Sequence, residues 1–321
     1  MFTPKVSIII PVYNLENCIG NTIRTLLSQT YKNLEIVLVD DGSSDSSLSI
    51  IKEFSIMDNR IIYTSQNNGG AAKARNIGLT LATGEFITFV DGDDMLSPNA
   101  IADNIGYFSN KEIDWVAFSI KRVNAKGEYI QAKDIYSDFI ISYYEEISSE
   151  AFVPYYYKHK LSGVACGAIY RKSSIDIISF AEGRYYEDSI FFIDLLCNTK
   201  NAILSTKGEY LYVDRENSSQ KALLDYKHLA SDYFCMTRRM KKYRTLFPQY
   251  ESFYSEQENS FYYFLKNEVA KQTEGAEFFF KQFKQEMHAP LKRLISKEIK
   301  FLFYKIVGYN RLKKLHILLK K

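Results

Sequence analysis

The first 120 residues alternate between short apolar runs and segments in which apolar residues recur every three or four positions. The runs are rich in Val, Ile and Phe, which is typical of buried strands. They predict strands at residues 6–10, 34–39, 61–65, 86–90 and 115–120. The segments between them predict helices, with apolar positions at 19, 23, 26 and 27, then 48, 51 and 54, then 74, 77 and 81.

Strands that alternate with helices favour a parallel sheet built from right-handed crossovers, with helices packed on its faces. We therefore predict an α/β fold with a Rossmann-like, mostly parallel sheet. The strand at 61–65 is short and predicts a sheet edge. In such sheets ligands bind beyond the carboxyl ends of the strands.

Four loops follow the predicted strands and should meet at one edge of the sheet. Each supplies polar, acidic, aromatic or glycine residues, which suit a nucleotide. They contain Pro11, Tyr13 and Asn14, then Asp40 to Ser43, then Gln66 to Gly70, then Asp91 to Asp94. Read singly, each loop is also compatible with a turn or a helix cap. The third loop leads into a helix that carries Lys73 and Arg75.

The acidic end of the fourth strand, Asp91-Gly92-Asp93-Asp94, concentrates three carboxylates around one glycine. Like charges at the end of a buried strand indicate a divalent cation with oxygen ligands. A solvated turn is the alternative, because Asp-Gly is common turn chemistry.

Composition is that of an ordinary globular protein, with 46% hydrophobic and 25% charged residues. The four cysteines lie far apart, so neither a zinc site nor a disulfide framework is expected, and we predict reduced thiols in the cytosol. The first apolar run ends at Pro11, which does not predict a signal peptide. No uncharged apolar run is long enough to span a bilayer.

Four blocks together resemble the family 2 glycosyltransferases with the GT-A fold, in order and in spacing. They are Val6 to Asn14, Val39 to Asp45, Asn68 to Leu79, and Asp91 to Asp94. The resemblance covers roughly residues 5–120. It implies inverting transfer of a sugar from a nucleoside diphosphate donor, with Mn²⁺ or Mg²⁺ as cofactor and UDP as the favoured nucleotide.

The resemblance also implies roles for single residues at the donor site. Tyr13 would stack on or flank the base, Asp41 would accept a hydrogen bond from uracil, and Pro11 would be a further residue of the nucleotide-sugar site. Lys73 or Arg75 would lie near the nucleotide.

In the acidic block, Asp91 would lie near the ribose and the metal, and Asp93 would bind the metal. Asp94 would be structural. Gly92 stands where the family usually has serine, which would remove a side chain beside the ribose.

Inversion requires a general base on the face opposite the leaving diphosphate. Glu187-Asp188 opens a predicted helix in which Phe191 and Leu195 are four positions apart. Acids also simply favour helix N-termini. Similarity to the family's Glu-Asp motif favours Asp188 as the base, with Glu187 orienting it or binding the acceptor.

A later segment, Tyr210 to Ser218, resembles one that often closes over the diphosphate in this family. Val213 stands where the family has an arginine, so the role of Arg215 is left open. The domain organisation that we predict is a transferase domain at residues 1–220, divided into a nucleotide-binding half, 1–120, and an acceptor half, 121–220. A helical, aromatic-rich region at 221–290 and a basic tail at 291–321 follow.

The aromatic-rich region predicts a core, with an acceptor groove or a surface for a homodimer as alternatives. The tail holds ten of the 41 Lys and Arg residues but only one of the 38 acids. Its apolar residues recur at helical spacing, which is typical of a helix on an anionic membrane surface. We expect a peripheral protein at the inner face of the cell membrane, with a glycan or lipid-linked glycan as acceptor. A helix docked on the protein's own core is the alternative.

Nucleic acid is not an expected partner, because no nucleic-acid-binding motif is present. A phosphatase of the haloacid dehalogenase type also has Asp-x-Asp after a strand, but there the pair follows the first strand of the core. A non-catalytic, membrane-associated scaffold with a degenerate transferase fold is the remaining alternative. The sequence thus favours a glycosyltransferase of surface polysaccharide, such as capsule, or of another glycoconjugate, moving a hexose or N-acetylhexosamine.

Overall fold

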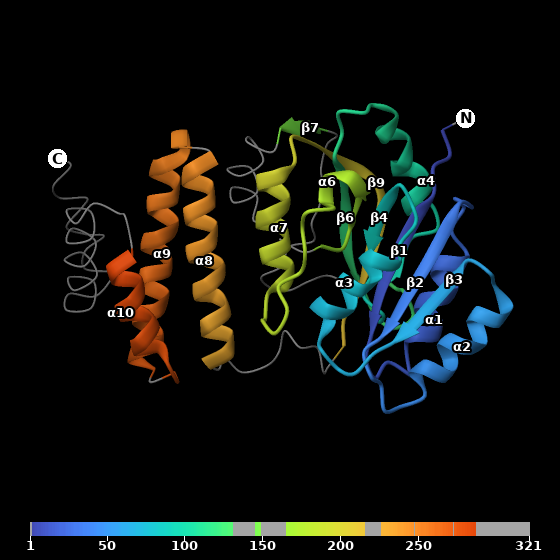
Figure 1. The fold of residues 1–321 in the computed structure, drawn as a ribbon, viewed down its shortest axis with the longest axis horizontal. Helices are drawn as coiled ribbons and strands as arrows, with labels where there is room; N and C mark the ends of the chain where they lie inside the picture. Colours follow the sequence, from blue (N-terminus) through green and yellow to red (C-terminus); the bar gives the residue numbers. More distant parts are fainter. Residues whose placement is uncertain are drawn as a thin grey trace. The chain divides into compact units, whose positions relative to one another are not determined.

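The computed structural model describes residues 2–130, 145–148, 165–215, 226–246, 248–271 and 273–286. The chain groups into two compact units, Met1–Leu223 and Leu224–Lys321 (Figure 1). The predicted basic tail at 291–321 lies outside the described residues. Among the described helices none is both long and apolar enough to cross a membrane.

A single mixed sheet forms the centre of the first unit. Its strands are β1 (Val6–Val12), β2 (Leu34–Asp40), β3 (Ile61–Ser65), β4 (Phe86–Phe89), β5 (Met95–Leu96), β6 (Trp115–Val123), β7 (Glu145–Ser148), β8 (Ala168–Arg171) and β9 (Asn201–Val213). Their order is β3-β2-β1-β4-β8-β6-β9-β5, and β7 pairs with β9. The α/β fold predicted from the pattern is confirmed.

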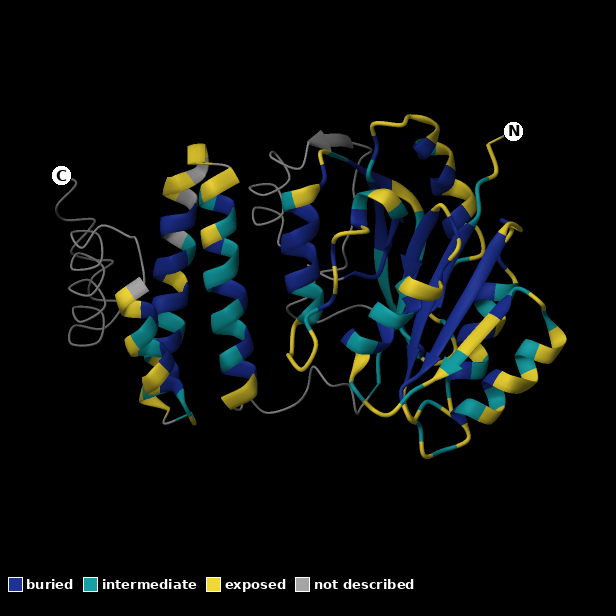
Figure 2. Ribbon diagram, in the orientation of Figure 1, coloured by how far each residue is buried: buried dark blue, intermediate teal, exposed yellow. Residues whose placement is uncertain are grey.

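The first half of the sheet is parallel, as predicted. β1 pairs with β2 and with β4, and β3 is the edge strand beside β2. Every residue of β1, β2 and β4 is buried, which explains their continuous apolar sequence (Figure 2). The carboxyl ends of these parallel strands therefore point to one edge, where the four polar loops begin.

The second half of the sheet is mixed. The predicted fifth strand exists as β6, but it does not lie beside β4. Instead β8 lies between them and pairs antiparallel with both. The periodicity of residues 1–120 could not reveal this arrangement, because β8 comes from more than 40 positions after β6.

Helices connect the strands of the first unit. They are α1 (Ile19–Leu27), α2 (Ser47–Met57), α3 (Ala71–Leu81), α4 (Ala100–Ile105), α6 (Lys172–Ile175) and α7 (Glu187–Asn198), with a 3₁₀ turn at Gly106–Ser109. The predicted apolar side of α3 is confirmed at Ala74, which is buried, but Ile77 is only half-buried and Leu81 is exposed. The buried residues are Ala72, Ala74, Arg75 and Gly78.

Close packing explains the buried side of α3. A Cβ on Gly78 would lie 2.3 Å from Cγ2 of Ile9, so only glycine lets the helix approach β1 this closely. Leu81, in contrast, is exposed. Arg75 is therefore buried, although the hydrophobic pattern did not predict a buried residue at this position.

The described part of the second unit, residues 226–246, 248–271 and 273–286, is helical, as the sequence predicts. It contains α8 (Tyr226–Leu246), a 3₁₀ turn at Pro248–Tyr250, α9 (Glu251–Ala270) and α10 (Ala276–Glu286). Phe261 on α9 and Phe283 on α10 are buried and meet edge-to-face, 5.0 Å between ring centroids. At these positions the aromatic residues form core, which was the leading prediction for this region.

Candidate active site

Hydrogen bonds join the loops that follow β1 and β2. The backbone N–H of Asn14 donates to Ser43 Oγ at 3.0 Å, and Ser44 N–H donates to Asn14 Oδ1 at 2.9 Å. Asn14 has a positive φ of 53°, a conformation that asparagine tolerates better than most residues. Tyr13, the residue before Asn14, is 49% exposed, so its ring is available to a ligand.

Asp41 holds the loop after β3. Its Oδ1 accepts hydrogen bonds from Gln66 Nε2 at 2.6 Å and from Gly69 N–H at 2.8 Å, and its Oδ2 accepts one from Gly70 N–H at 2.8 Å. A carboxylate offers about four acceptor positions, so one remains for a further donor. The geometry is compatible with the predicted contact to a base and adds a structural role.

Gly70 precedes the first turn of α3 and has a φ of +87°. Lys73 lies in that turn, and its aliphatic chain covers Gly69, where a Cβ would be 2.5 Å from Lys73 Cδ. Tyr13 and Asp41 thus lie on two consecutive strand-end loops, and Lys73 lies in the first turn of the helix that follows the third loop.

Gly92 is packed against the loop after β1. A Cβ at this position would lie 2.7 Å from Leu15 Cδ1 and 3.0 Å from the carbonyl oxygen of Pro11. Its own carbonyl accepts a hydrogen bond from Thr22 Oγ1 at 3.0 Å. The glycine therefore permits close packing inside the protein, because a side chain at this position would collide with Leu15 and Pro11.

Asp94 is bound within the protein. Its Oδ2 accepts a hydrogen bond from the Tyr210 hydroxyl at 2.6 Å, and its Oδ1 accepts one from Val213 N–H at 2.9 Å. Burial and the nearby Asp91 raise the pKa of Asp94 to about 8, although the two hydrogen bonds oppose this shift. These contacts support the structural role predicted for Asp94.

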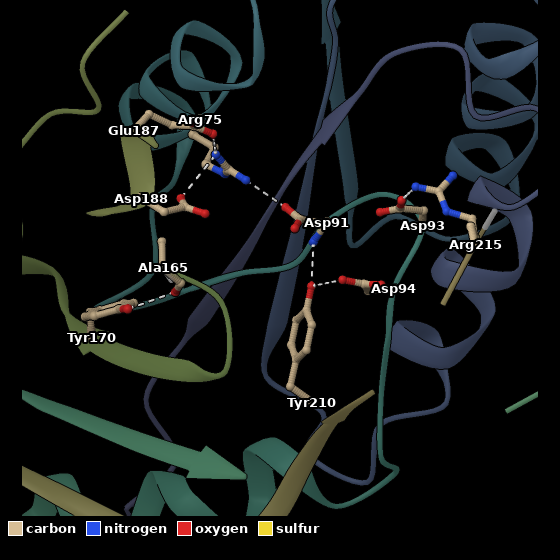
Figure 3. Close-up of polar contacts among 10 residues, drawn as sticks. All are labelled: Arg75, Asp91, Asp93, Asp94, Ala165, Tyr170, Glu187, Asp188, Tyr210 and Arg215. Atoms are coloured by element: carbon tan, nitrogen blue, oxygen red, sulfur yellow. Dashed lines mark hydrogen bonds and ion pairs between the residues drawn. The ribbon is translucent and has the colours of Figure 1, made fainter. Parts of the chain in front are cut away.

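Asp91 and Asp93 are the accessible carboxylates of this loop. Their side chains are 34% and 17% exposed, and Asp93 forms an ion pair with Arg215 (Figure 3). Arg215, whose role the sequence left open, thus supplies a cation at the predicted metal ligand.

No three His, Cys, Asp or Glu side chains in the described part of the chain converge to enclose a metal ion. Mg²⁺ and Mn²⁺ sites of nucleotide enzymes commonly use one or two carboxylates, with phosphate oxygens as further ligands. Asp93 and Asp91, which are paired with Arg215 and Arg75 here, would be the carboxylates of such a site, and phosphate oxygens of a bound nucleotide would be its further ligands.

The second carboxylate pair lies at the start of α7, as predicted. Glu187 and Asp188 are its first two residues and follow Tyr186, which has a positive φ of 59°. Such a conformation is uncommon for an aromatic residue and is concentrated at functional sites. Arg75 joins this pair to Asp91, because its guanidinium contacts all three carboxylates.

The side chain of Asp188 is 21% exposed, and its Oδ1 is buried without a hydrogen-bond partner among the described residues. Arg75 Nη1 lies 3.4 Å from this oxygen. Burial raises the pKa of Asp188 to about 7, with Arg75 opposing the shift and Glu187 adding to it. A carboxylate with a pKa near neutrality is suited to proton transfer.

Backbone from a distant segment also holds Asp188. Ala165 supplies a backbone hydrogen bond to the carboxylate, and its carbonyl accepts a 2.8 Å hydrogen bond from the buried Tyr170 hydroxyl (Figure 3). The four blocks that resemble the family do not include this segment, and Tyr170 was not predicted as a member of the site. Tyr210 was expected only as the start of a segment that resembles one closing over the diphosphate, with no role assigned to its hydroxyl.

The model of the family described as Glycosyl transferase family 2 matches residues 7–178, which is more than half of the chain. The chain belongs to this family. It is 32% identical over 225 residues to the Glycosyltransferase GlyA of Streptococcus pneumoniae serotype 4. The matched part is 67% of this chain and 31% of GlyA, so this chain spans about a third of that relative.

Two solved structures share the fold. S. aureus TarS 1–349, in complex with UDP-GlcNAc, superposes with a TM-score of 0.63 over 75% of this chain and 66% of the other, at 23% identity. The mannosyltransferase PcManGT of Pyrobaculum calidifontis, in complex with GDP-Man and Mn²⁺, covers 95% of this chain and 82% of the other, with a TM-score of 0.56 and 16% identity. The predicted GT-A fold is confirmed.

Proposed function

We propose that this chain is an inverting glycosyltransferase that moves a sugar from a nucleoside diphosphate donor to a hydroxyl of a glycan acceptor. One observation carries the proposal. Asp188, whose pKa is raised to about 7 and whose Oδ1 lies 3.4 Å from Arg75 Nη1, is joined through this arginine to Asp91 in the acidic strand-end loop. A proton acceptor is thus fixed beside the loop that would hold the donor diphosphate.

In the reaction that we propose, the acceptor hydroxyl gives its proton to the carboxylate of Asp188. The acceptor oxygen forms a bond to the anomeric carbon while the bond between that carbon and the diphosphate breaks. The electron pair of the broken bond leaves with the nucleoside diphosphate. Attack from the opposite face inverts the anomeric configuration.

A divalent cation held by Asp93 and Asp91 would neutralise charge on the leaving diphosphate. The protein's own residues would hold the nucleotide. Tyr13 offers an exposed ring for the base, and Asp41 offers one remaining acceptor position for a base N–H.

UDP is the preferred nucleotide, and a hexose or N-acetylhexosamine the preferred sugar, in this proposal. Membership of the family supports a nucleotide sugar, and the UDP-GlcNAc complex of the structurally similar TarS supports this choice of donor. The donor of PcManGT carries guanosine instead, so GDP-Man belongs in any test.

The acceptor that we propose is a glycan or a lipid-linked glycan used in polysaccharide synthesis at the cytoplasmic face of the membrane. The charge of the tail at 291–321 supports membrane contact. That contact remains a prediction, as does the homodimer.

A thermal-shift screen tests the donor proposal. UDP-GlcNAc, UDP-glucose, UDP-galactose and GDP-Man are each added with Mn²⁺ and with a chelator. At least one donor should raise the Tm, and should raise it more with Mn²⁺, because binding to the folded state alone stabilises it. If no nucleotide or nucleotide sugar shifts the Tm, the scaffold alternative replaces the enzyme.

A further inference from the structure

Arg75 is a cation in a position where a helix usually carries an apolar residue. Its side chain is only 4% exposed, on the same face of α3 as Ala74 and Gly78. An arginine buried in this way normally has carboxylate partners, because an uncompensated charge in the interior is strongly unfavourable. Its partners come from two other elements.

The guanidinium of Arg75 uses its two Nη atoms for different elements (Figure 3). Nη2 lies 2.7 Å from Asp91 Oδ1, at the end of β4, and Nη1 lies 2.8 Å from Glu187 Oε1 and 3.4 Å from Asp188 Oδ1, at the start of α7. The group also lies over the ring of Phe180, 5.2 Å from its centroid. One planar cation thus connects the acidic strand-end loop to the helix that carries the proposed base.

The ring beneath the guanidinium is itself fixed in place. The side-chain amide of Asn76, the next residue on α3, donates to the carbonyl of Phe180 at 3.0 Å and accepts from its N–H at 2.8 Å. Phe180 stacks on Phe191 of α7, with 4.5 Å between centroids and 6° between planes. Phe180 is therefore fixed to α3 by hydrogen bonds and to α7 by stacking. The ring beneath the Arg75 guanidinium thus has a defined position.

The charge of Arg75 is permanent in this setting. Burial lowers its pKa, but Asp188 and Asp91 overcome this effect and hold the pKa well above its usual value. Each Nη atom donates to a protein carboxylate and the side chain is only 4% exposed, which leaves the guanidinium poorly placed to bind a nucleotide phosphate. This contrasts with the expectation that Lys73 or Arg75 lies near the nucleotide.

We infer that Arg75 is a positioning residue: it holds the carboxylates of Asp188 and Glu187 at a fixed position relative to Asp91 and does not itself bind the donor. The inference rests on the proposed role of Asp188 as base. A guanidinium is required because its fork can bond to two elements at once, whereas the lysine ammonium is a compact charge on a flexible chain.

The test compares Arg75→Met and Arg75→Lys with a matched control, Arg171→Met. Arg171 is also a partly buried guanidinium, lying over the rings of Phe86 and Phe108 and bonded to the carbonyl of Ile113 at 3.1 Å. None of these contacts involves Asp91, Glu187 or Asp188. Hydrogen exchange of the ligand-free proteins and calorimetric binding of UDP with Mn²⁺ are measured for each.

For Arg75→Met we expect exchange about tenfold faster in residues 91–94 and 187–191, since each segment loses a charge-assisted hydrogen bond. UDP affinity should remain close to the wild-type value. Mn²⁺ and UDP should slow exchange in residues 187–191 of the wild type but not of the variant, which a merely structural arginine would not produce. Arg171→Met should change none of these quantities in the two segments.

If Arg75→Met does not fold, Arg75→Lys decides the question, because one ammonium cannot serve both elements and at least one segment should exchange faster. Wild-type exchange in both segments of Arg75→Lys would overturn the inference, as would a large loss of UDP affinity with normal exchange. If the wild type itself binds neither UDP nor GDP, the proposed function fails. The exchange of the ligand-free variants then still decides whether Arg75 holds the two elements together.

Discussion

The hydroxyl of Tyr210 donates a hydrogen bond to Oδ2 of Asp94 across 2.6 Å. The same hydroxyl accepts a hydrogen bond from the backbone N–H of Asp91 at 3.2 Å. Tyr210 lies on β9, so this one phenol anchors the acidic loop after β4 to a strand 116 positions later in the chain. The loop that presents Asp91 and Asp93 is therefore held in place by the buried side chain of Tyr210.

Tyr210→Phe tests this anchor. The variant should unfold with a free energy lower by about 1–3 kcal/mol, because the buried Asp94 and the Asp91 N–H each lose a partner. Urea unfolding measures the change. Tyr129→Phe removes a hydrogen bond to Glu209 at an exposed site and should have little effect. Equal stability of the two variants would contradict the anchoring role.

Asp93→Ala tests the proposed metal ligand. With this carboxylate removed, Mn²⁺ should no longer increase the affinity for UDP, while the weaker metal-independent binding persists. Calorimetric titration of UDP, once with Mn²⁺ and once with a chelator, measures the metal-dependent and the metal-independent affinity. Asp103→Ala, an exposed acid in the first turn of α4, is the control. A metal-dependent gain that survives in Asp93→Ala would assign the metal to other ligands.

The raised pKa values of Asp188 and Asp94 predict an unusual dependence of stability on pH. Both groups keep their protons up to a pH of about 7 or 8 in the folded protein, whereas in the unfolded chain they lose them near their ordinary value of 3.8. The folded state binds more protons in this window. Their contribution to stability is therefore present below a pH of about 4 and is lost as pH rises through 7 to 8.

Urea unfolding of the ligand-free protein at several pH values between about 4 and 8 measures this effect. Asp188→Asn and Asp94→Asn should each reduce the loss of stability on going from low to high pH, because an amide has no proton to lose. Asp103→Asn should keep the wild-type slope. Parallel curves for all four proteins would show that neither carboxyl is perturbed by folding.

Glu35 predicts the opposite behaviour at lower pH. Burial raises its pKa, but hydrogen bonds from Ser7, Thr83 and Lys5 outweigh this and lower it to about 2. Its stabilising contribution is present above the ordinary value of 4.5 and is lost as pH falls towards 2. The carboxylate joins β1 and β2 to the segment before β4, through bonds of 2.6 Å to Ser7 and 2.8 Å to the N–H of Thr83.

Glu35→Gln should lower the unfolding free energy at neutral pH by about 1–3 kcal/mol, because the amide cannot accept all of these bonds. The loss should shrink as pH falls below 4.5, where the wild type begins to lose its own carboxylate. Glu53→Gln, at an exposed position of α2, is the control. A constant difference between Glu35→Gln and wild type at all pH values would contradict the role of charge.

Much of the first half could be predicted from sequence, because buried parallel strands are continuous apolar runs with local boundaries. Once β1 to β4 were assigned, the topology placed their polar loops at one edge without any knowledge of contacts. The Glu187-Asp188 pair could be found because it opens a helix with a local signal and is similar to the Glu-Asp motif of the family; its helical position alone is equally explained by the preference of acids for helix N-termini. The order of the later strands could not, since β8 lies between β4 and β6 through pairings between distant residues.

The support of the site could not be predicted for the same reason. Arg75 contacts Glu187 112 positions away, and nothing in the local pattern separates it from a solvated helical arginine. Tyr210 was expected to begin a segment that closes over the diphosphate, and nothing in the sequence pairs its hydroxyl with Asp94 and Asp91, which it contacts from β9. Gly92 reads as a small departure beside the ribose, but the structure requires it for packing against Pro11 and Leu15.

The most direct test of the central claim compares UDP release with UDP binding in Asp188→Asn. The wild type and the variant receive the nucleotide sugar selected by the thermal-shift screen, with Mn²⁺ and without a glycan acceptor, so that water takes the sugar and gives its proton to residue 188. The rate of UDP release in this hydrolysis and the affinity for UDP are both measured. The account predicts unchanged affinity and a rate lower by about 10²–10⁴-fold, because the amide cannot accept the proton. A variant that releases UDP at the wild-type rate would contradict it.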